Sequence, residues 1–240
     1  MKPLHIITPV KDSIASTLET AEAILSSKIR SPFAYTIYND FSTAENTAIL
    51  EKFVAERGSK MRLVNLAEIT FHPSPNYLLI LQMSQEQALK SGADLMIVES
   101  DVVVRPNTLQ ALVDGAAEHR DCGIAASVTV NDNGDINYPY EYARGHKGEC
   151  FSTRRHCSFC CSLLTNSLLK AYDFHSLNPD KHWFDVSISQ QSRALGFNNY
   201  LFANLPVVHR PHTSRPWKQL KYTNPLKYYW LKFSQGRDSI

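Results

Sequence analysis

Short apolar runs of strand length alternate with longer segments of helical spacing through the first hundred residues. The apolar runs lie at residues 4–10, 33–38 and 61–66, and a fourth begins at residue 93. Between them, residues 14–25, 44–57 and 75–91 repeat their apolar side chains every three or four positions. Gly58 and Gly92 follow the last two of these helical segments. This order predicts an α/β fold with a mostly parallel sheet flanked by helices.

Polar residues follow the expected strands at one edge of the predicted sheet. They are Thr8 and Pro9, Asn39 and Asp40, and Glu99 and Asp101. Ligands of open α/β sheets bind beyond the carboxyl ends of the strands, where these residues fall. On an extended strand, Glu99 and Asp101 would project to the same face about 6.6 Å apart. Acids at the end of a buried strand cost free energy unless a cation meets them, although a lone Glu-x-Asp pair also suits a solvated strand end.

The 240-residue chain divides by charge into a mildly acidic body and a basic tail. Residues 210–240 hold seven of the 25 Lys and Arg and one of the 23 acids, which leaves 18 and 22 for residues 1–209. We therefore expect one α/β domain over residues 1–212 and a C-terminal extension over residues 213–240. The acidic body argues against an extended nucleic-acid track, so we expect no nucleic-acid partner.

The tail, from Arg215 to Arg237, combines lysines with aromatic side chains and is interrupted by Pro225. Basic and aromatic residues together are typical of an interfacial membrane helix, in which each Lys or Arg near an anionic surface adds about 1 kcal/mol. Alternatively, the aromatics pack on the domain with the lysines outward, and this second interpretation is preferred. No signal peptide or membrane-length apolar run is found, and the odd number of cysteines, five, suggests a reducing compartment. We expect a cytoplasmic protein, with the inner face of the membrane as a peripheral contact.

Several short polar motifs follow one another in a characteristic order. They are Thr8-Pro9, Asn39-Asp40-Phe41-Ser42, Asn76 at a helix start, Glu99-Ser100-Asp101, Asp185 eleven residues before Gly196, and His209 after an apolar run. In this order and spacing, over residues 4–212, the chain resembles GT-A glycosyltransferases of the family-two type, which use nucleotide-sugar donors. The resemblance implies a GT-A-like fold and gives each motif a role.

The first two motifs would bind the nucleotide part of the donor. By the resemblance, Thr8 and Pro9 border the base, Asp40 contacts a uracil as the second acid of a D-D-x-S-like turn, and Ser42 belongs to the same site. Asn39 departs from the aspartate that the family usually has there.

The third strand-end motif and the late histidine would hold a divalent ion. Asp101 would be a direct ligand, His209 would complete the site, and Glu99, in place of an aspartate, would act through water or reach the donor ribose. Hard ions such as Mg²⁺ and Mn²⁺ prefer oxygen ligands, and an imidazole ligand favours Mn²⁺. His209 could equally be a strand-end histidine bonded to the backbone, and His212 is a second choice as ligand.

Asp185 would be the catalytic base that takes the proton of the attacking acceptor hydroxyl. Phe184 stands where the family usually has a glutamate. The alternative is structural, because Asp180 and Asp185 lie near the start of an expected helix, where acids are favoured by capping and by the helix dipole.

The resemblance therefore implies an inverting glycosyltransferase of the hexosyltransferase type, in polysaccharide biosynthesis. The donor would be a nucleotide-sugar, with UDP-sugar favoured, and the acceptor a glycan or a lipid-linked molecule. Because Glu99 and Phe184 depart from the family pattern, the alternative is a catalytically silent GT-A-like module that binds a nucleotide or a glycan. A nucleotidyltransferase fits less well, since no Gly-rich phosphate loop follows the first strand.

Two further segments have competing interpretations. Residues 128–142 read as a loop and residues 143–155 as polar and irregular, with Tyr138, Tyr140 and Tyr142 as either a sugar-stacking surface or, preferably, a short half-buried strand. The cluster Cys157, Cys160 and Cys161 lacks a second C-x-x-C pair, so burial in the core is favoured over a metal site.

Overall fold

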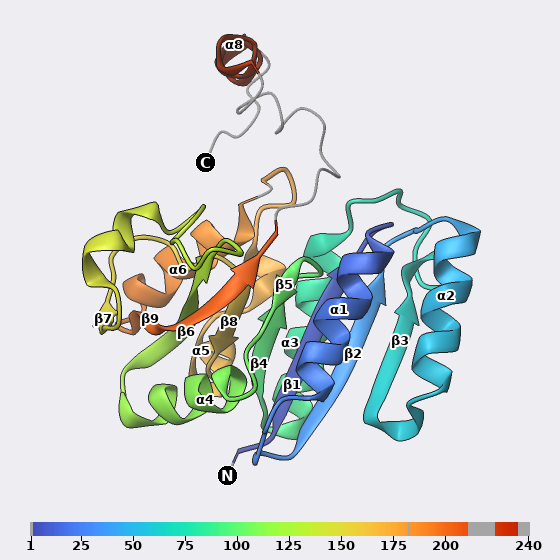
Figure 1. The fold of residues 1–240 in the computed structure, drawn as a ribbon, viewed down its shortest axis with the longest axis horizontal. Helices are drawn as coiled ribbons and strands as arrows, with labels where there is room; N and C mark the ends of the chain where they lie inside the picture. The colour runs from blue at the N-terminus through green and yellow to red at the C-terminus, as the bar shows by residue number, and fades with distance from the viewer. Residues whose placement is uncertain (1, 182, 211–223, 235–240) are drawn as a thin grey trace.

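The first half of the chain repeats strand and helix in strict alternation (Figure 1). The computed structural model describes residues 2–181, 183–210 and 224–234, without the side chain of residue 232. The elements of this half are β1 (Leu4–Val10), α1 (Ile14–Leu25), β2 (Phe33–Asn39), α2 (Ala44–Ala55), β3 (Met61–Asn65), α3 (Tyr77–Ser91) and β4 (Asp94–Val98). β1 pairs in parallel with β2 and β4, and β2 pairs in parallel with β3. The predicted elements are confirmed.

Local sequence signals set the ends of these helices. The Thr43 hydroxyl accepts a hydrogen bond from the Asn46 amide and caps α2 at 3.3 Å. Gly92 ends α3 in the left-handed conformation, with φ of 65°, which a residue without Cβ adopts at little cost. The alternation is therefore specified mainly by residues close in sequence.

The second half of the chain adds short strands in mixed directions. Its elements are β5 (Val102–Val103), α4 (Thr108–Glu118), β6 (Cys122–Val130), β7 (Cys150–Ser152), β8 (Cys161–Leu164), α5 (Asn166–Ala171), α6 (Phe184–Ala194) and β9 (Asn198–His209). The sheet order is β3-β2-β1-β4-β8-β6-β9-β5, with β7 paired to β9. β8 lies antiparallel between β4 and β6, while β9 runs parallel to β6. The fold class is α/β, as predicted, and each antiparallel pair includes at least one strand of this half.

Helices cover both faces of the sheet, and a separate apolar core fills the space on each. α1, α2 and α4 bury Ile24, Leu50 and Leu112 on one face, and these helices lie in front of the sheet in Figure 1. α3, α5 and α6 cover the opposite face. Both faces of the central strands are therefore buried, which explains their continuous apolar sequence.

The segment between β6 and β8 is largely irregular, as predicted, but it contains short elements that the sequence did not indicate. β6 extends to Val130, a 3₁₀ helix spans Glu141–His146, and β7 follows it. The preferred interpretation of the three tyrosines as a half-buried strand is wrong: none lies in a strand, Tyr140 is fully buried and Tyr138 is 37% exposed. The Tyr140 hydroxyl accepts a hydrogen bond from the Ser158 amide at 2.8 Å, so this tyrosine anchors the segment inside the domain.

The described part of the tail is one helix, α8 (Pro225–Ser234). Pro225 is its first residue, where a missing N–H costs nothing. In Figure 1, α8 lies above the upper edge of the domain, where the strands β1 and β2 end. Leu226, Trp230 and Phe233 are 86%, 66% and 93% exposed, whereas Tyr228 is buried at 6%. The preferred interpretation of aromatics packed on the domain is therefore wrong for Trp230 and Phe233, but the burial of Tyr228 agrees with it. The predicted domain boundary and Trp217 lie outside the described residues.

No helix in the described ranges has the length and apolar character needed to cross a membrane.

Candidate functional site

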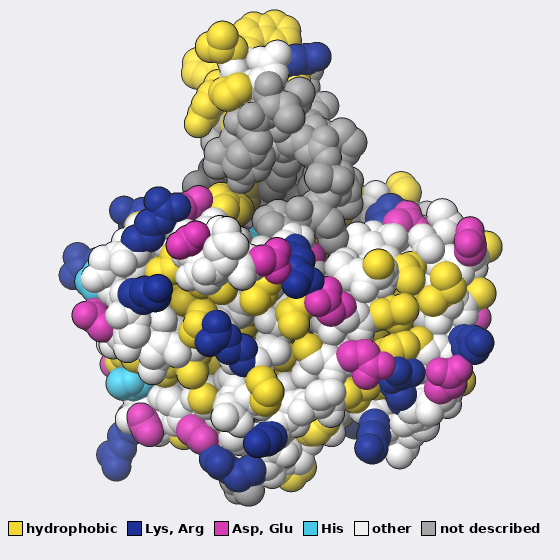
Figure 2. Space-filling view, in the orientation of Figure 1, with side chains coloured by type: hydrophobic (Ala, Val, Ile, Leu, Met, Phe, Trp, Pro, Cys, Tyr) yellow, Lys and Arg dark blue, Asp and Glu magenta, His cyan; other side chains and the backbone are white. Residues whose placement is uncertain are grey.

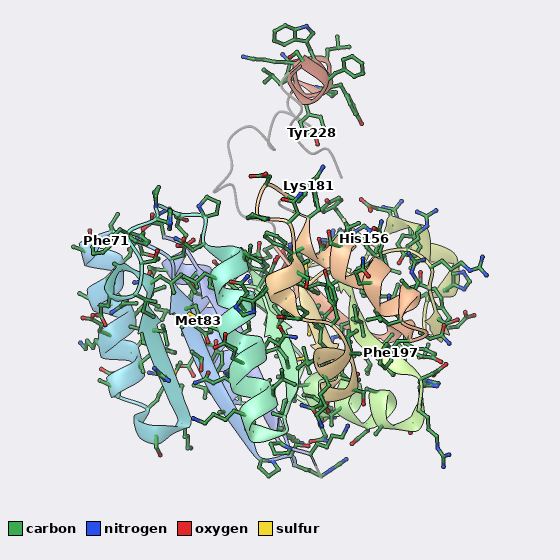
Figure 3. All side chains as sticks on the ribbon, turned by 180° about the vertical axis from the view of Figure 1, so that it is seen from behind. Phe71, Met83, His156, Lys181, Phe197 and Tyr228 are labelled. Atoms are coloured by element: carbon green, nitrogen blue, oxygen red, sulfur yellow. The ribbon has the colours of Figure 1, made fainter. Side chains whose placement is uncertain are left out.

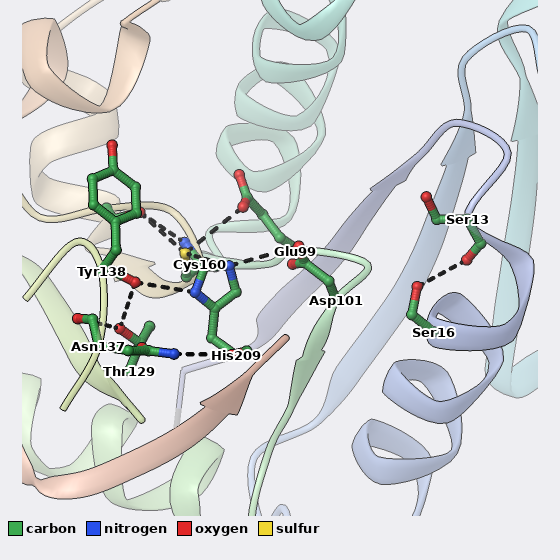
Figure 4. A network of polar contacts seen from close by, with 10 residues as sticks. Ser13, Ser16, Glu99, Asp101, Thr129, Asn137, Tyr138, Cys160 and His209 are labelled. Atoms are coloured by element: carbon green, nitrogen blue, oxygen red, sulfur yellow. Dashed lines mark hydrogen bonds and ion pairs between the residues drawn. The ribbon is translucent and has the colours of Figure 1, made fainter. Parts of the chain in front are cut away.

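Four side chains from three distant segments meet beyond the end of β4 (Figure 4). Glu99 and Asp101 lie on the turn after β4, Cys160 immediately precedes β8, and His209 ends β9. The Cys160 Sγ lies 3.7 Å from Glu99 Oε2 and 3.9 Å from His209 Nε2. The His209 Nε2 lies 3.6 Å from Asp101 Oδ2. One oxygen, one sulfur and one nitrogen from Glu99, Cys160 and His209 lie within 4.8 Å of one another.

Backbone pairing holds these segments in register. The Glu99 amide donates to the Cys160 carbonyl at 3.0 Å, because β4 and β8 pair Val98 with Cys161. The Arg210 amide donates to the Asp101 carbonyl at 3.0 Å, next to the pairing of Val102 with His209 between β5 and β9. The strand register therefore brings the four side chains together.

Glu99 and Asp101 do not lie on one face of a strand, as the sequence suggested. The Val102 amide donates to the Glu99 carbonyl at 3.2 Å, which closes a tight turn over residues 99–102. The turn aims Glu99 toward Cys160 and Asp101 toward His209. The sequence therefore placed both acids at the end of β4 correctly, but a turn and not a strand positions their side chains.

The ring of His209 is oriented by its backbone contacts. Its Nδ1 lies 3.1 Å from the Tyr138 carbonyl oxygen, which can only accept, so Nδ1 carries the proton of that hydrogen bond. In the neutral ring, Nε2 then presents its lone pair toward Asp101 and Cys160. The Asn137 amide group donates to the His209 carbonyl at 3.0 Å and fixes the same strand end. The predicted backbone bond of His209 is confirmed. It uses one ring nitrogen only, so the role of His209 as a metal ligand stays a prediction.

The site is buried and rich in groups that attract positive charge. Asp101 and His209 are 8% and 6% exposed. Burial lowers the pKa of His209, but the neighbouring Cys160 and Asp101 outweigh it and raise that pKa well above its ordinary value. Burial also raises the pKa of the Cys160 thiol. A cation at Nε2, whether a proton or a metal ion, is therefore favoured by this arrangement.

Cys160 is the site residue that the sequence did not identify. Its predicted burial is confirmed, since it is 3% exposed, and Cys157 and Cys161 are fully buried as well. Its position next to Glu99 follows from antiparallel pairing of β8 with β4. No local motif encodes that pairing, so residue spacing around Cys160 gave no signal for it.

Asp40 lies at the same edge of the sheet, beyond β2, and holds the start of α3. Its Oδ1 accepts from the Asn76 side-chain amide at 2.7 Å. Its Oδ2 accepts from the Asn76 backbone amide at 2.9 Å and from the Ser74 hydroxyl at 2.6 Å. The two oxygens of a carboxylate offer about four lone-pair positions. Three donors already bond to Asp40, so little room is left for a further hydrogen bond.

The hydrogen bonds of Asn39 account for an asparagine, rather than an aspartate, at this position. Its side-chain NH₂ donates to Thr47 Oγ1 at 2.9 Å and to Asn65 Oδ1 at 3.0 Å, while its oxygen accepts from the Ser42 amide. An ionised aspartate has no donor and could not replace the bond to Asn65 Oδ1, whose NH₂ is already bonded to Glu51 and Glu68. The side chain at this position is therefore part of the scaffold.

The loops after β1 and β2 are tied to each other. The Ser42 hydroxyl accepts from the Asp12 amide at 2.9 Å, and the Lys11 ammonium group donates to the Phe41 carbonyl at 2.8 Å. Lys11 is an exposed cation at this edge that the sequence reading did not single out. Thr8 does not reach the edge, because β1 continues to Val10; Thr8 is fully buried, and its hydroxyl accepts from Tyr35 at 2.9 Å. Pro9 is half-buried.

Asp185 occupies the first turn of α6, and its Oδ1 accepts from the Val186 amide at 2.9 Å. The helix dipole favours an acid at this place, as the structural interpretation expects, but the N-cap residue is Trp183 and no side chain caps the helix. The Asp185 side chain is half-buried. Phe184 is 5% exposed and stacks on Tyr77 of α3, with ring centroids 6.4 Å apart. The position where the family has a glutamate is therefore part of the apolar core in this chain. His212, the second choice as metal ligand, lies outside the described residues.

Solved structures of three glycosyltransferases share this fold. A structure of GalNAc-T7 with UDP, GalNAc and Mn²⁺ matches with a TM-score of 0.66 and 11% identity, over 89% of this chain and 45% of that one. Residues 1–349 of S. aureus TarS match with 0.65 and 16%, over 87% and 60%. The mannosyltransferase PcManGT from Pyrobaculum calidifontis, in complex with GDP-Man and Mn²⁺, matches with 0.65 and 12%, over 99% and 65%.

These similarities establish a GT-A-like α/β fold. The chain spans between about half and two thirds of the length of the structures it matches. No protein-family model matches the sequence, and the comparison with curated proteins found no match.

Proposed function

We propose that the chain is an inverting, metal-dependent glycosyltransferase, with a UDP-sugar as the favoured donor and a glycan or lipid-linked molecule as the acceptor. The observation that carries this proposal is the meeting of Glu99, Cys160 and His209, with Asp101 beside them, at the carboxyl edge of a GT-A-like sheet. Two of the structures with this fold contain Mn²⁺ and a nucleotide ligand, UDP in one and GDP-Man in the other.

Asp101 and His209 would hold the divalent ion, with Glu99 as a third ligand or bound through water. Two observations indicate that these residues suit a divalent ion. Glu99, Cys160 and His209 each offer a ligand atom to a common point, and the bond from His209 Nδ1 to the backbone leaves Nε2 directed toward that point. A bound divalent ion supplies Lewis-acid neutralisation of the charge that develops on the leaving diphosphate. Carboxylates alone suit Mg²⁺ or Mn²⁺, and the imidazole favours Mn²⁺. Cys160 adds a soft donor, which increases the affinity for Zn²⁺ relative to Mg²⁺.

The nucleotide would lie over the joined loops after β1 and β2. Pro9, Asp40 and Ser42 belong to this region, and the fully buried Thr8 supports it from below. Asp40 would use its remaining lone-pair capacity to accept from the base while it keeps the start of α3 in place. Lys11, at the same edge, would add a cation near the donor.

Asp185 would accept the proton of the acceptor hydroxyl as that oxygen attacks the anomeric carbon. The attack forms the new glycosidic bond on the face opposite the leaving diphosphate, so the configuration inverts. A carboxylate can serve as base because the hydroxyl becomes strongly acidic only as the bond to carbon forms. The position of Asp185 on a helix gives it a rigid support.

A catalytically silent module that binds a nucleotide or a glycan is the second candidate. The buried Phe184 favours it, because the family's glutamate is absent beside the proposed base. The two candidates differ in turnover: both bind a nucleotide, but only the enzyme transfers or hydrolyses the sugar.

We also propose that α8 contacts an anionic membrane surface. Leu226, Tyr229, Trp230 and Phe233 recur at helical spacing and are all more than half exposed. Figure 2 shows that apolar side chains cover much of α8. The surplus of Lys and Arg in residues 210–240 complements an anionic surface. Co-sedimentation with phosphatidylserine vesicles should be lost in Trp230→Glu; equal binding of the variant would contradict this contact.

The direct test of the metal site is titration calorimetry of UDP in the presence and absence of Mn²⁺. Asp101→Asn should abolish metal-dependent UDP binding and leave the far-UV spectrum of the ligand-free protein unchanged. Asp135→Asn, an exposed acid in the loop after β6, is the matched control. Unchanged binding by Asp101→Asn would remove this residue from the metal site.

A further inference from the structure

A basic hollow of about 320 Å³ lies between the segment after β6 and the outer face of α6. Its charged and polar lining comes from both sides: Tyr142, Arg154, Arg155 and His156 from the segment, and Gln190 and Arg193 from α6. Figure 3 shows His156 beside the helices on this side of the domain.

Two of the three arginines are held in place by contacts that leave their charge available. The Arg155 guanidinium carbon lies 4.5 Å from the centre of the Tyr142 ring, so the planar group rests on a flat support. The Arg193 guanidinium donates to the Arg154 carbonyl oxygen, and its Nε donates to the Ser189 carbonyl at 3.4 Å. These partners are uncharged, and they orient the guanidinium groups without neutralising them.

The positive charge of the hollow is not balanced by nearby acids. Across residues 2–181, 183–210 and 224–234, no carboxylate lies within ion-pair distance of Arg154, Arg155 or Arg193. By contrast, Arg30 and Arg210 each pair with a carboxylate at 2.6 Å. A group of arginines in a hollow without acids is suited to an oxyanion, since guanidinium matches phosphate and carboxylate with two parallel hydrogen bonds.

The hollow lies along the same helix as the proposed base. Val186 lines the hollow and directly follows Asp185, while Arg193 lies eight residues further along α6. At 1.5 Å per residue, the two ends of this arrangement are about 12 Å apart. A ligand with its anion at Arg193 would therefore present to Asp185 a group about 12 Å from that anion, and not the anion itself.

We infer that this hollow binds the oxyanion of a negatively charged acceptor, a phosphate or a carboxylate on a glycan, and so positions a more distant hydroxyl at Asp185. The inference rests on the proposed function for the role of Asp185 but not for the binding of the anion. The substrate class is an anionic glycan, and a neutral sugar of similar size lacks the group that the arginines recognise.

The test measures binding of small anionic probes by two-dimensional NMR and calorimetry. Glycerol phosphate and glucuronate are the two probes, and glycerol and glucose are their neutral counterparts. At least one anionic probe should bind, shift the resonances of Tyr142 and Gln190, and weaken as the salt concentration rises. Arg155→Gln should weaken that binding at least tenfold, and Arg155→Lys should restore only part of it. Arg120→Gln, at an exposed arginine beyond α4, is the matched control and should bind like the wild type.

Each result has one meaning. Binding of glycerol phosphate alone supports a phosphate-bearing acceptor, and binding of glucuronate alone supports a carboxylate-bearing one. Absence of binding by both probes, equal binding of the neutral counterparts, or an equal loss in Arg120→Gln overturns the inference. Because Arg155 lies outside the metal site, UDP–Mn²⁺ binding of Arg155→Gln should be unchanged. A wild-type protein that binds the anion but not UDP–Mn²⁺ would count against the proposed function alone.

Discussion

The two halves of the sheet use the polar side chains at their carboxyl edge in different ways. Beyond β1 and β2, the side chains of Asp12, Asn39 and Asp40 bond to neighbouring loops and helix starts. Beyond β4 and β9, the side chains of Glu99 and His209 converge with Cys160 on a common point. The first edge is a scaffold whose polar groups satisfy one another, whereas the second collects donor atoms that suit a cation.

The largest expected effect is a loss of catalysis when Asp185, in the second half of the chain, is substituted. Asp185→Asn removes the proposed base, so transfer should fall about 10²–10⁴-fold, the range that general bases contribute. The affinity for UDP–Mn²⁺ should be nearly unchanged, because Asp185 lies on α6 and not in the metal cluster. The measurement is single-turnover transfer together with calorimetry.

The matched control for this variant is Asp180→Asn, at an exposed acid five residues earlier. It should transfer at the wild-type rate. Normal turnover in Asp185→Asn would leave the residue as a helix-start acid and would remove the base from the proposed mechanism.

Phe184→Glu tests whether the departure from the family pattern is structural. The change places a carboxylate where a ring with 5% exposure stacks on Tyr77, so it should lower the free energy of unfolding by about 3–5 kcal/mol. Urea denaturation measures the loss. Phe71→Glu, at a fully exposed phenylalanine, is the control and should change the stability little. A stable Phe184→Glu protein with increased turnover would show that this position can take the family's catalytic role.

We expect His5, on β1 in the first half of the sheet, to make the stability of the protein depend on pH. This residue is 4% exposed, and burial lowers its pKa from 6.5 to about 4. Between those values the unfolded chain binds a proton that the folded protein does not, so stability is complete above pH 6.5 and falls as the pH drops toward 4. The expected loss is about 3 kcal/mol, at 1.36 kcal/mol for each pKa unit.

Denaturation of wild type and His5→Gln at pH 7 and pH 4 isolates this contribution. The wild type should lose about 3 kcal/mol more than the variant over this range, while His175→Gln, at an exposed histidine, should behave like the wild type. Parallel pH profiles for wild type and His5→Gln would contradict a buried neutral His5.

The smallest effect tests Asp40 as the anchor of α3. Asp40→Asn keeps the shape but places a donor NH₂ against the Ser74 hydroxyl or the Asn76 amide, so unfolding should become about 1–3 kcal/mol easier. Asp135→Asn, which is exposed, should change the stability by less than about 0.5 kcal/mol. If Asp40→Asn loses nucleotide binding at full stability, its main role is ligand contact rather than support of the scaffold.

The elements from β1 to β4 could be predicted from the sequence because the residues that specify them lie close to one another in the chain. Helical spacing, the Thr43 cap and Gly92 lie within a few residues of the boundaries they set. The second half depends on pairings between segments such as β4 with β8, which join residues more than 60 positions apart. Periodicity contains no information on such pairings, so the place of Cys160 could not be derived. Glu99 and Asp101 were singled out as acids at the end of an expected strand, whereas His209 was added only because a resemblance supplied the long-range relation that the residues alone did not.

The metal-dependent nucleotide site is the central claim, and thermal unfolding with nucleotides tests it most directly. The purified chain is heated with UDP, GDP, CDP or TDP, each with and without Mn²⁺. A ligand at a hundredfold excess over its dissociation constant stabilises the folded state by about 2.7 kcal/mol, or roughly 5–11 °C for a chain of this size. We predict such a shift with UDP only when Mn²⁺ is present, and its loss in Asp101→Asn. No shift with any of the four nucleotides, or an equal shift without the metal, would contradict the proposed site.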